Sequence, residues 1–514
     1  MKIQIRHRYL VFPANHLAAK KRLSFFKGDR SLYTLDISLD NIAPRFEAFV
    51  DVSRFMGEEL TLSLSPELPL SYRETDEIDL DGLYEEPYRP LVHFTTKSGW
   101  INDPNGLIFL NGTYHMFYQH NPCDIVWSNM HWGHATSTDL LHWREEPIAL
   151  YPDETGAMYS GCAIVDEQNR TGLGEGKTPP TLLFYTATSP FSQYLAYSTD
   201  SLKTIKKYRP ALIGHIVDEN RDPSVAFVEE WGAYALALFL SGNEYGIFRS
   251  ENLLEWTLIQ RLHFPEEREC PDLFVMTSKQ GERKWVLMGA NDRYLIGDMT
   301  SEGFCPDGEP KRLHYGKHAY AGQTFSGMTD GRTVRMHWVR AAMRTPRFTG
   351  QMGIPTELTL SRQGGELVLL TNPIRELSSL FITNESFAPA VSPDAPFRHP
   401  LTEGAYLIRL RAEDEVYAKL ALSVFGKTLE IDTSRQTLTF LRHEMPLTLS
   451  SGTTELTLLI DRLSLELFLD GGRHFATFMD EGTVSDYNLP YLELRADQKL
   501  PPLSLEIHAL SPIR

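Results

Sequence analysis

Short apolar runs interrupted by Gly, Asn, Asp and Pro are the dominant pattern along this chain. Residues 106–110 (GLIFL), 113–118 (TYHMFY) and 181–185 (TLLFY) are typical, and each is the length of one β-strand. Apolar positions that recur with the period of a long helix are scarce. The pattern therefore predicts an all-β fold, and a sandwich, a barrel and a propeller all satisfy it.

A weak internal repeat favours the propeller. The sequence STDLLHW at residues 137–143 returns as SENLLEW at 250–256, with a fainter copy, STDSLK, at 198–203. The copies follow strand-like runs and lie about 50–60 residues apart, which suits one four-stranded blade with its loops. The alternative is that each copy is only a common polar turn. We prefer the repeat because all three copies follow strands.

The remainder of the chain predicts two further β units. Beyond residues 372–377 the runs 407–411 (LIRLR) and 465–469 (LELFL) alternate as half-buried strands do, which indicates a β-sandwich. Strand-like runs also occur before a linker of acids and prolines at 85–90. We therefore divide the chain into a small N-terminal β-domain with its linker (1–90), a propeller (91–375) and a sandwich (376–514).

Charge and composition narrow the class of ligand. The 514 residues carry a formal net charge of -17, so no basic surplus is available to neutralise the phosphates of a nucleic acid. A neutral ligand such as a sugar fits better. The N-terminus lacks the features of a signal peptide, and no apolar run of about 20 residues predicts a membrane span. The four cysteines have no CxxC spacing, so we expect no zinc site and a cytoplasmic protein with reduced thiols.

Three short motifs set an acid beside a proline or a polar turn residue in an apolar, aromatic-rich context. They are WINDPNG at residues 100–106, RDP at 221–223 and ECPD at 269–272. On the scale of the repeat, Asp103 and Asp222 lie about two blades apart, and Asp222 and Glu269 about one. Acids near the starts of innermost strands would meet at one end of the propeller axis. Two carboxylates on either side of one bond are what glycoside hydrolysis needs.

Together with other motifs these acids identify a family. The additional motifs are FYQHNP at residues 117–122, MHWGHA at 130–135, YSG at 159–161, QTF at 323–325 and IDRLSLELF at 460–468. The chain resembles glycoside hydrolase family 32, the β-fructofuranosidases, which include invertases, levanases and inulinases. The resemblance covers nearly everything from Leu91 onward, and it implies a five-bladed propeller followed by a β-sandwich. Cys162 and Thr356 depart from the family's usual Ser and Arg, which leaves the range of substrates open.

The resemblance implies a role for each acid. Asp103 is expected to be the nucleophile of a retaining mechanism, held by Asn102 and Asn105 in its ionised form. Glu269 is expected to be the general acid/base, with a pKa raised by the charges of Asp103 and Asp222. Asp222 is expected to bind fructose hydroxyls. The alternatives are an ordinary DPNG turn at Asp103 and a surface glutamate in the charge run PEERE at residues 265–269.

Further side chains are candidates for the pocket wall, because aromatic faces stack on sugar C–H groups while polar groups bind hydroxyls. The predicted substrate-binding residues are Asn102, Gln119, Trp127, Tyr159, Ser160, Arg221 and Trp338. For Tyr159 and Trp338 a place in the propeller core is a strong alternative, and for Arg221 a buried ion pair with Asp222. Cys270 is expected to be a packed thiol, and His131 and His134, on opposite faces of a strand, to be structural.

The sequence thus predicts a retaining exo-β-fructosidase acting on terminal β-D-fructofuranosides in levan, inulin, fructo-oligosaccharides or sucrose, without metal or cofactor. A fructosyltransferase would use the same residues but transfer the fructosyl group to a sugar. A non-catalytic fructan-binding protein would keep the pocket and lose the acids. Because all three acids are present, the binding protein is the weaker alternative.

Overall fold

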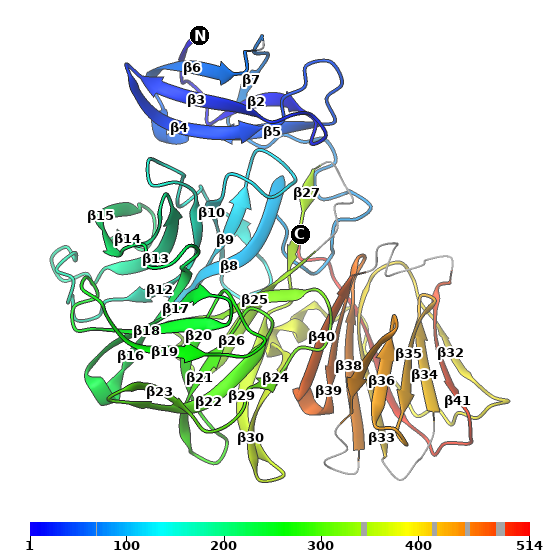
Figure 1. The fold of residues 1–514 in the computed structure, drawn as a ribbon. Helices are drawn as coiled ribbons and strands as arrows, with labels where there is room; N and C mark the ends of the chain where they lie inside the picture. The colour runs from blue at the N-terminus through cyan, green and yellow to red at the C-terminus, as the bar shows by residue number, and fades with distance from the viewer. Residues whose placement is uncertain (68, 341–346, 414–418, 448–452, 480–488) are drawn as a thin grey trace.

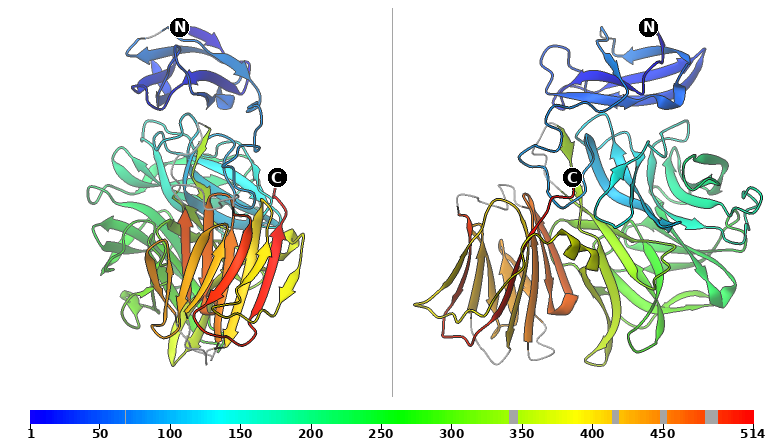
Figure 2. Two further views of the ribbon diagram at one scale, coloured as in Figure 1. Left: turned by 90° about the vertical axis from the view of Figure 1, so that its right-hand side faces the viewer. Right: turned by 180° about the vertical axis from the view of Figure 1, so that it is seen from behind.

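Three β units follow one another along the chain in the computed structural model, which describes residues 1–67, 69–340, 347–413, 419–447, 453–479 and 489–514. Figure 1 shows the N-terminal unit, in blue, above the large central unit, in cyan to yellow, with the C-terminal unit, in orange and red, beside it. The two further views in Figure 2 show the same arrangement from the side and from behind.

In the described residues, the central unit consists of five sheets, each the blade of a propeller. The first blade contains β8 (Gly99–Leu110), β9 (Thr113–Asn121), β10 (His131–Ser137), β11 (Arg144–Glu145) and the short β27 (Phe348–Thr349). The second contains β12 (Met158–Val165), β13 (Thr181–Thr188), β14 (Phe191–Ser198) and β15 (Lys206–Ile213). The third contains β16 (Arg221–Val228), β17 (Ala233–Ser241), β18 (Glu244–Ser250) and β19 (Thr257–His263).

The last two blades carry extra short strands. The fourth contains β20 (Asp272–Thr277), β21 (Arg283–Met288), β22 (Arg293–Thr300), β23 (Gly303–Pro306) and β24 (Lys311–Arg312). The fifth contains β25 (Ala319–Thr324), β26 (Thr333–Val339), β28 (Gln351–Met352), β29 (Thr356–Gln363) and β30 (Glu366–Pro373). The fold class predicted from the sequence is confirmed.

The first strand of each blade lines the axis of the propeller. β8 contacts β12, β12 contacts β16, β16 contacts β20, β20 contacts β25, and β25 contacts β8 again, so these strands form a closed ring. Burial follows the position of a strand in its blade. The second strand β13 is almost wholly buried because neighbouring blades cover both its faces, whereas the outermost strand β19 is largely exposed.

The predicted repeat is the turn at the end of the third strand. Ser137, Ser198 and Ser250 are the last residues of β10, β14 and β18, and each hydroxyl accepts the backbone N–H of the residue two positions on. The following leucines at 140, 202 and 253 all have positive φ. The repeat therefore marks one equivalent turn in three successive blades.

Two six-stranded sheets pack face to face to form the C-terminal sandwich. One contains β31 (Glu385–Phe387), β42 (Ser504–Leu510), β33 (Ala405–Glu413), β38 (Thr453–Ile460), β39 (Ser464–Leu469) and β40 (His474–Met479). The other contains β32 (Phe397–Pro400), β41 (Tyr491–Ala496), β34 (Lys419–Val424), β35 (Lys427–Asp432), β36 (Thr437–Phe440) and β37 (His443–Pro446).

One sequence-based expectation about the sandwich is wrong. The strand β39 was expected to be half-buried because LELFL alternates, but all of its residues are buried. The reason is that its second face lies against the propeller. There the Glu466 carboxylate lies 3.3 Å from Nε2 of His337 and 3.5 Å from Nε2 of His93, and Asp461 lies 2.8 Å from Nδ1 of His93. All four side chains are buried, so the two units share a charged core.

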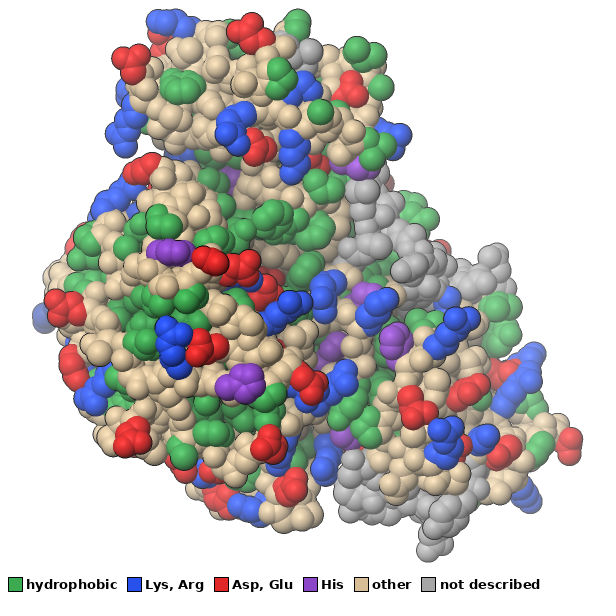
Figure 3. All heavy atoms as spheres, viewed as in Figure 1, with side chains coloured by type: hydrophobic (Ala, Val, Ile, Leu, Met, Phe, Trp, Pro, Cys, Tyr) green, Lys and Arg blue, Asp and Glu red, His purple; other side chains and the backbone are tan. Residues whose placement is uncertain are grey.

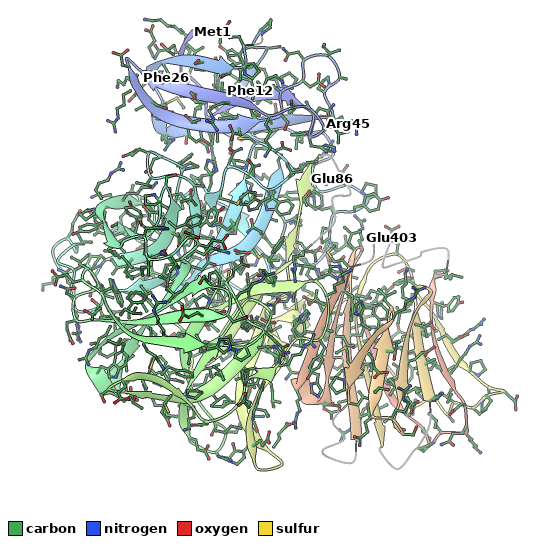
Figure 4. The ribbon with its side chains drawn as sticks, in the orientation of Figure 1. Met1, Phe12, Phe26, Arg45, Glu86 and Glu403 are labelled. Atoms are coloured by element: carbon green, nitrogen blue, oxygen red, sulfur yellow. The ribbon has the colours of Figure 1, made fainter. Side chains whose placement is uncertain are left out.

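The N-terminal unit has a sheet of four strands and a sheet of three. The four-stranded sheet contains β1 (Lys2–Gln4), β6 (Glu59–Ser65), β3 (Lys21–Lys27) and β4 (Arg30–Ile37). The three-stranded sheet contains β5 (Phe46–Asp51), β2 (Tyr9–Ala14) and β7 (Arg73–Thr75). Phe12 lies in this unit, and Glu86 in the segment that leads to the propeller (Figure 4). The core of the unit includes Cys123 and Tyr151 of the propeller, so the two units pack together.

The described helices are short 3-10 turns: η1 (Ser53–Phe55), η2 (Glu229–Trp231), η3 (Arg375–Leu380) and η4 (Asp470–Gly472). In the part of the chain that the structure describes, none is long and apolar enough to span a membrane. Acidic and basic side chains are interspersed over the face of the molecule in Figure 3.

Candidate active site

A pocket of about 350 Å³ receives side chains from the innermost strands of the propeller. Every residue predicted for the site lines it: Asn102, Asp103, Gln119, Trp127, Tyr159, Ser160, Arg221, Asp222, Glu269 and Trp338. The acids come from three different blades, since Asp103 lies on β8, Asp222 on β16, and Glu269 just before β20. The expected spacing of two blades and then one is confirmed.

Irregular pairing in the inner strands accompanies the pocket. The register between first and second strand shifts after Ile101 in β8, Tyr159 in β12, Arg221 in β16 and Tyr320 in β25. A bulge places an extra residue in one strand and re-aims the side chains beside it. The strands thereby turn side chains into the pocket at one end of the ring, although regular pairing would alternate them between the blade faces.

The backbone is unusual at two of the acids. Asp222 has φ of 64°, Glu269 of 55° and Cys270 of 41°, all in the left-handed region. This region is unfavourable for residues other than glycine, and each such residue costs about 1–3 kcal/mol unless local contacts compensate. The strained positions coincide with the candidate chemistry, which is where such strain is typically found.

Asp103 is held by neighbouring donors. The Ser160 hydroxyl donates to Oδ2 of Asp103 at 2.7 Å. Burial raises the pKa of Asp103, while the hydrogen bonds from Ser160 and Asn102 oppose that rise by favouring the carboxylate. Asn102 is in turn oriented by the Trp100 indole, which donates to its side-chain oxygen at 2.9 Å.

The expectation that Asn105 also holds Asp103 needs correction. With its amide oriented so that oxygen and nitrogen both find partners, Asn105 donates to the Ser160 hydroxyl at 3.2 Å and accepts the backbone N–H of Gln119 at 3.1 Å. Asn105 is fully buried and lies behind the serine. It therefore orients Ser160, and only through Ser160 does it affect Asp103.

Asp222 lies deep in the pocket, with 5% of its surface exposed. Its Oδ2 accepts the backbone N–H of Cys270 at 3.0 Å and lies 3.4 Å from the Cys270 thiol. Burial raises the pKa of Asp222 to about 7, although the charge of Arg221 opposes the rise. Of the three acids, Asp222 is thus the one most able to hold a proton near neutral pH.

Glu269 behaves differently from the prediction. Burial alone would raise its pKa, but hydrogen bonds from Tyr320 and Arg221 outweigh burial and lower it. Nη2 of Arg221 donates to Oε1 of Glu269 at 2.5 Å, and the Tyr320 hydroxyl donates to Oε2. The expected rise in the pKa of Glu269 from the charges of Asp103 and Asp222 is therefore wrong. Arg221 also forms the ion pair with Asp222 that was considered as an alternative, with Nε 3.8 Å from Oδ2.

The charge run at residues 265–269 has three distinct glutamates. Glu266 is exposed and pairs with Arg293, whereas Glu267 is fully buried. The Glu267 carboxylate accepts the backbone N–H groups of Asn291 at 3.0 Å and of Arg293 at 2.7 Å. Glu267 thus fixes the segment that carries Glu269 toward the pocket, and the surface alternative for Glu269 does not apply.

Aromatic side chains form the remaining wall. Trp127 lies edge-on to Tyr159, with ring centroids 6.2 Å apart, and Tyr159 is edge-on to Phe191 at 5.7 Å. On the other side, Trp338 meets Trp100 at 5.9 Å. Trp127 is 54% exposed, which places it at the mouth of the pocket.

Sequence reasoning missed several residues that line the pocket: Met130, Phe191, Glu219 and Tyr320. Two of them stand near recognised motifs, since Glu219 precedes the RDP motif and Tyr320 precedes QTF. Met130 is the first residue of the MHWGHA motif, whereas Phe191 carries no comparable signal. Glu219 lies 3.2 Å from Arg221 and is itself exposed, so it extends the charged network to the pocket edge.

Residues suited to metal binding do not cluster here. Within the described ranges, no three or more His, Cys, Asp or Glu side chains are grouped to hold a metal ion. His131 and His134 have separate partners. His131 Nε2 is 2.7 Å from the Tyr33 hydroxyl, and His134 Nε2 is 3.0 Å from Nδ1 of His115.

A propeller with three carboxylates converging at one end of its axis, followed by a sandwich, defines a class of glycoside hydrolases. Residues 93–371, more than half of the chain, match the glycosyl hydrolases family 32 N-terminal domain. The chain belongs to glycoside hydrolase family 32 and is a glycoside hydrolase of the β-fructofuranosidase type.

Individual relatives support the same assignment. The chain is 29% identical to a levanase of Bacillus subtilis over 84% of this chain and 71% of that protein. It is 33% identical to a fructan beta-fructosidase of Streptococcus mutans over 62% of this chain and 24% of that protein. The fold is similar to the crystal structure of exo-inulinase from Aspergillus awamori, with a TM-score of 0.76 and 24% identity over 84% of this chain and all of that one.

Proposed function

We propose that this enzyme is a retaining exo-β-fructosidase that hydrolyses terminal β-D-fructofuranosides. The observation that carries the proposal is the convergence of Asp103, Asp222 and Glu269 in one pocket of about 350 Å³. This volume is at the lower end of the range for ligand sites, which suits one terminal sugar and part of the next. An enzyme that cuts within a polymer needs instead a groove open at both ends.

In the first step of the proposed reaction, the Asp103 carboxylate attacks the anomeric carbon C2 of the terminal fructosyl unit. Glu269 donates its proton to the glycosidic oxygen as the C2–O bond breaks, and the rest of the substrate leaves as an alcohol. In the second step Glu269 removes a proton from water. The water oxygen bonds to C2, the ester to Asp103 breaks, and fructose is released.

Arg221 and Tyr320 favour the ionised form of Glu269, so these contacts have to change when Glu269 takes up a proton. Three carboxyls that line one small pocket can share a proton, and the raised pKa of Asp222, about 7, supports one shared proton near neutral pH. A substrate hydroxyl that takes over the bond from Arg221 or Tyr320 would let Glu269 take up that proton. Asp222, then ionised, would accept hydrogen bonds from fructose hydroxyls.

The class of substrate is proposed from the relatives. A levanase, a fructan beta-fructosidase and an exo-inulinase act on fructose polymers by their names. A beta-fructofuranosidase of similar fold is described in complex with fructosyl-erythritol. We propose levan, inulin, fructo-oligosaccharides or sucrose as substrates.

We also propose a cytoplasmic location, which the four free thiols support and which fractionation of the producing cells would test.

The test is direct. Sucrose, inulin and levan are incubated with the enzyme, and early products are followed by NMR and chromatography. The proposal expects fructose as the first product from the chain ends, released as the β-anomer. Oligosaccharides as first products, or the α-anomer, would contradict it. Transfer of fructose to sugar at high sucrose concentration would indicate the fructosyltransferase alternative.

A further inference from the structure

The loop between β9 and β10, residues 122–130, carries Trp127 to the mouth of the pocket. Asn121, the last residue of β9, ties the loop together from within. Its side chain donates to the carbonyl of Val126 at 2.8 Å and accepts from the Asn129 amide at 3.3 Å. Val126, directly before Trp127, and Asn129, two residues after it, are thus fixed relative to β9.

The same loop is held from outside by the N-terminal unit. Asn129 donates to the backbone carbonyl of Asp36 at 2.8 Å and accepts its backbone N–H at 2.9 Å. Asp36 lies on β4, an edge strand, so the Asn129 amide pairs with that edge as another strand would. Asn129 has φ of 45°, a conformation that asparagine tolerates better than most residues.

Two further contacts extend this attachment. The Ser38 hydroxyl donates to Oδ2 of Asp124 at 2.9 Å, in a buried position. Cys123 is completely buried within the hydrophobic core of the N-terminal unit. The loop is therefore attached through residues before and after Trp127, while Trp127 itself is 54% exposed.

From this geometry we propose that the N-terminal unit takes part in substrate recognition, with Asn129 as a positioning residue that sets the place of Trp127. The inference rests on the proposed function. Asp222 and Ser160 are each only 5% exposed and mark the pocket floor, where the fructosyl unit is cleaved. The leaving group then points toward the mouth. Trp127 is placed to stack on the sugar that follows the cleaved bond.

The experiment compares two substrates that differ only in that next unit. Sucrose has a sugar as its leaving group, whereas methyl β-D-fructofuranoside has a methoxy group that does not reach the mouth. Asn129→Ala removes the hydrogen bonds to β4. We expect the KM of this variant for sucrose to rise about three- to tenfold, because the loss of one or two hydrogen bonds leaves Trp127 less well positioned. The KM for the methyl fructoside should stay unchanged.

A double-mutant cycle connects the effect to the indole. In a Trp127→Ala background, Asn129→Ala should add nothing to the KM for sucrose, because the positioned group is absent. Asn111→Ala is the matched control. Asn111 also has positive φ, 52°, and donates to Ser201 at 3.2 Å, but its turn belongs to the far end of β8. Should Asn129→Ala fail to fold, Ser38→Ala, which loses the bond to Asp124, replaces it.

Equal KM changes for both substrates, or additive effects of the two substitutions, would overturn the inference. The wild-type enzyme distinguishes this failure from that of the proposed function. If the wild type releases no fructose from either substrate, both the proposed function and the inference are refuted. If the wild type is active and Asn129→Ala has an unaltered KM for sucrose, only the role of the N-terminal unit is refuted.

Discussion

Arg221 and Glu269 form the shortest ion pair between two pocket residues, with Nη2 of Arg221 2.5 Å from Oε1 of Glu269. The two residues come from different blades, and both have contacts elsewhere in the pocket. Because Arg221 is positively charged, it stabilises Glu269 as a carboxylate. A candidate acid is thus held in its basic form by its neighbours, and the pH dependence of the enzyme should report those neighbours.

Tyr320→Phe should move the alkaline limb of the pH profile of kcat/KM upward. The Tyr320 hydroxyl lowers the pKa of Glu269, so its removal raises that pKa, and the protonated acid persists to higher pH. A hydrogen bond to a charged group corresponds to a shift of about one pH unit. Initial rates across pH measure the shift. Tyr406→Phe, which removes a hydroxyl bonded to Thr402 in the sandwich, is the control and should leave the profile unchanged.

Asp103→Ala should lower kcat by about four orders of magnitude or more, because the covalent step is lost. Added azide should restore turnover of an activated fructoside by attacking from the vacated side, which yields α-fructosyl azide. The corresponding Glu269→Ala variant keeps the nucleophile and should yield the β-azide. NMR of the azide products distinguishes the two. The same configuration from both variants would show that the roles are assigned incorrectly.

The melting temperature should fall as pH rises from about 6.5 to about 9, and the deprotonation of His93 should account for a large part of this fall. Burial alone would lower the pKa of His93, but Asp461 and Glu466 raise it to about 9. The contribution of His93 to the free energy of unfolding is therefore complete below its unfolded-state pKa of about 6.5. It is lost as the pH rises through its folded-state pKa. The contribution is of the order of 3 kcal/mol.

Calorimetric scans of His93→Gln measure this contribution. The variant should melt at lower temperature near pH 6 and lose most of the slope toward pH 9. His142→Gln serves as a control, because His142 is exposed and pairs only with Asp139 at the surface. An identical slope in wild type and His93→Gln would exclude the buried histidine as the titrating group.

Cys305 should react with iodoacetamide at least about tenfold faster than Cys270. Cys305 is exposed, whereas Cys270 is half-buried, and its thiol pKa is raised by burial and by the charges of Asp103 and Asp222. Since only the thiolate is reactive, Cys270 should remain unlabelled near pH 8. Mass spectrometry of peptides after timed labelling gives both rates. Rapid labelling of Cys270 would indicate an ionised thiol and contradict the expected electrostatics.

The sequence predicts the order of blades and the three acids because both leave local signals. Strand-length apolar runs define the blades, and short motifs surround Asp103, Asp222 and Glu269. The predicted rise in the pKa of Glu269 is wrong because this pKa depends on Tyr320 and Arg221. Both residues belong to other blades and contact Glu269 only when the ring of blades closes.

The fully buried face of β39 has the same explanation. Its alternation predicts one buried face, and only the docking of the sandwich on the propeller buries the other, through Glu466 and His337. Phe191 was missed because nothing in its local sequence marks it as a pocket residue. Features that depend on two distant segments thus lay beyond one-dimensional patterns.

The left-handed backbone at Asp222 and Glu269 lowers the stability of the fold at two residues on which the proposed activity depends. Glycine adopts this conformation without steric penalty, so Asp222→Gly or Glu269→Gly would relieve the local strain. A directed-evolution screen that selects for heat resistance alone would retain such glycine substitutions and yield a more thermostable but inactive protein. Any engineering of this scaffold therefore has to select for turnover in the same round.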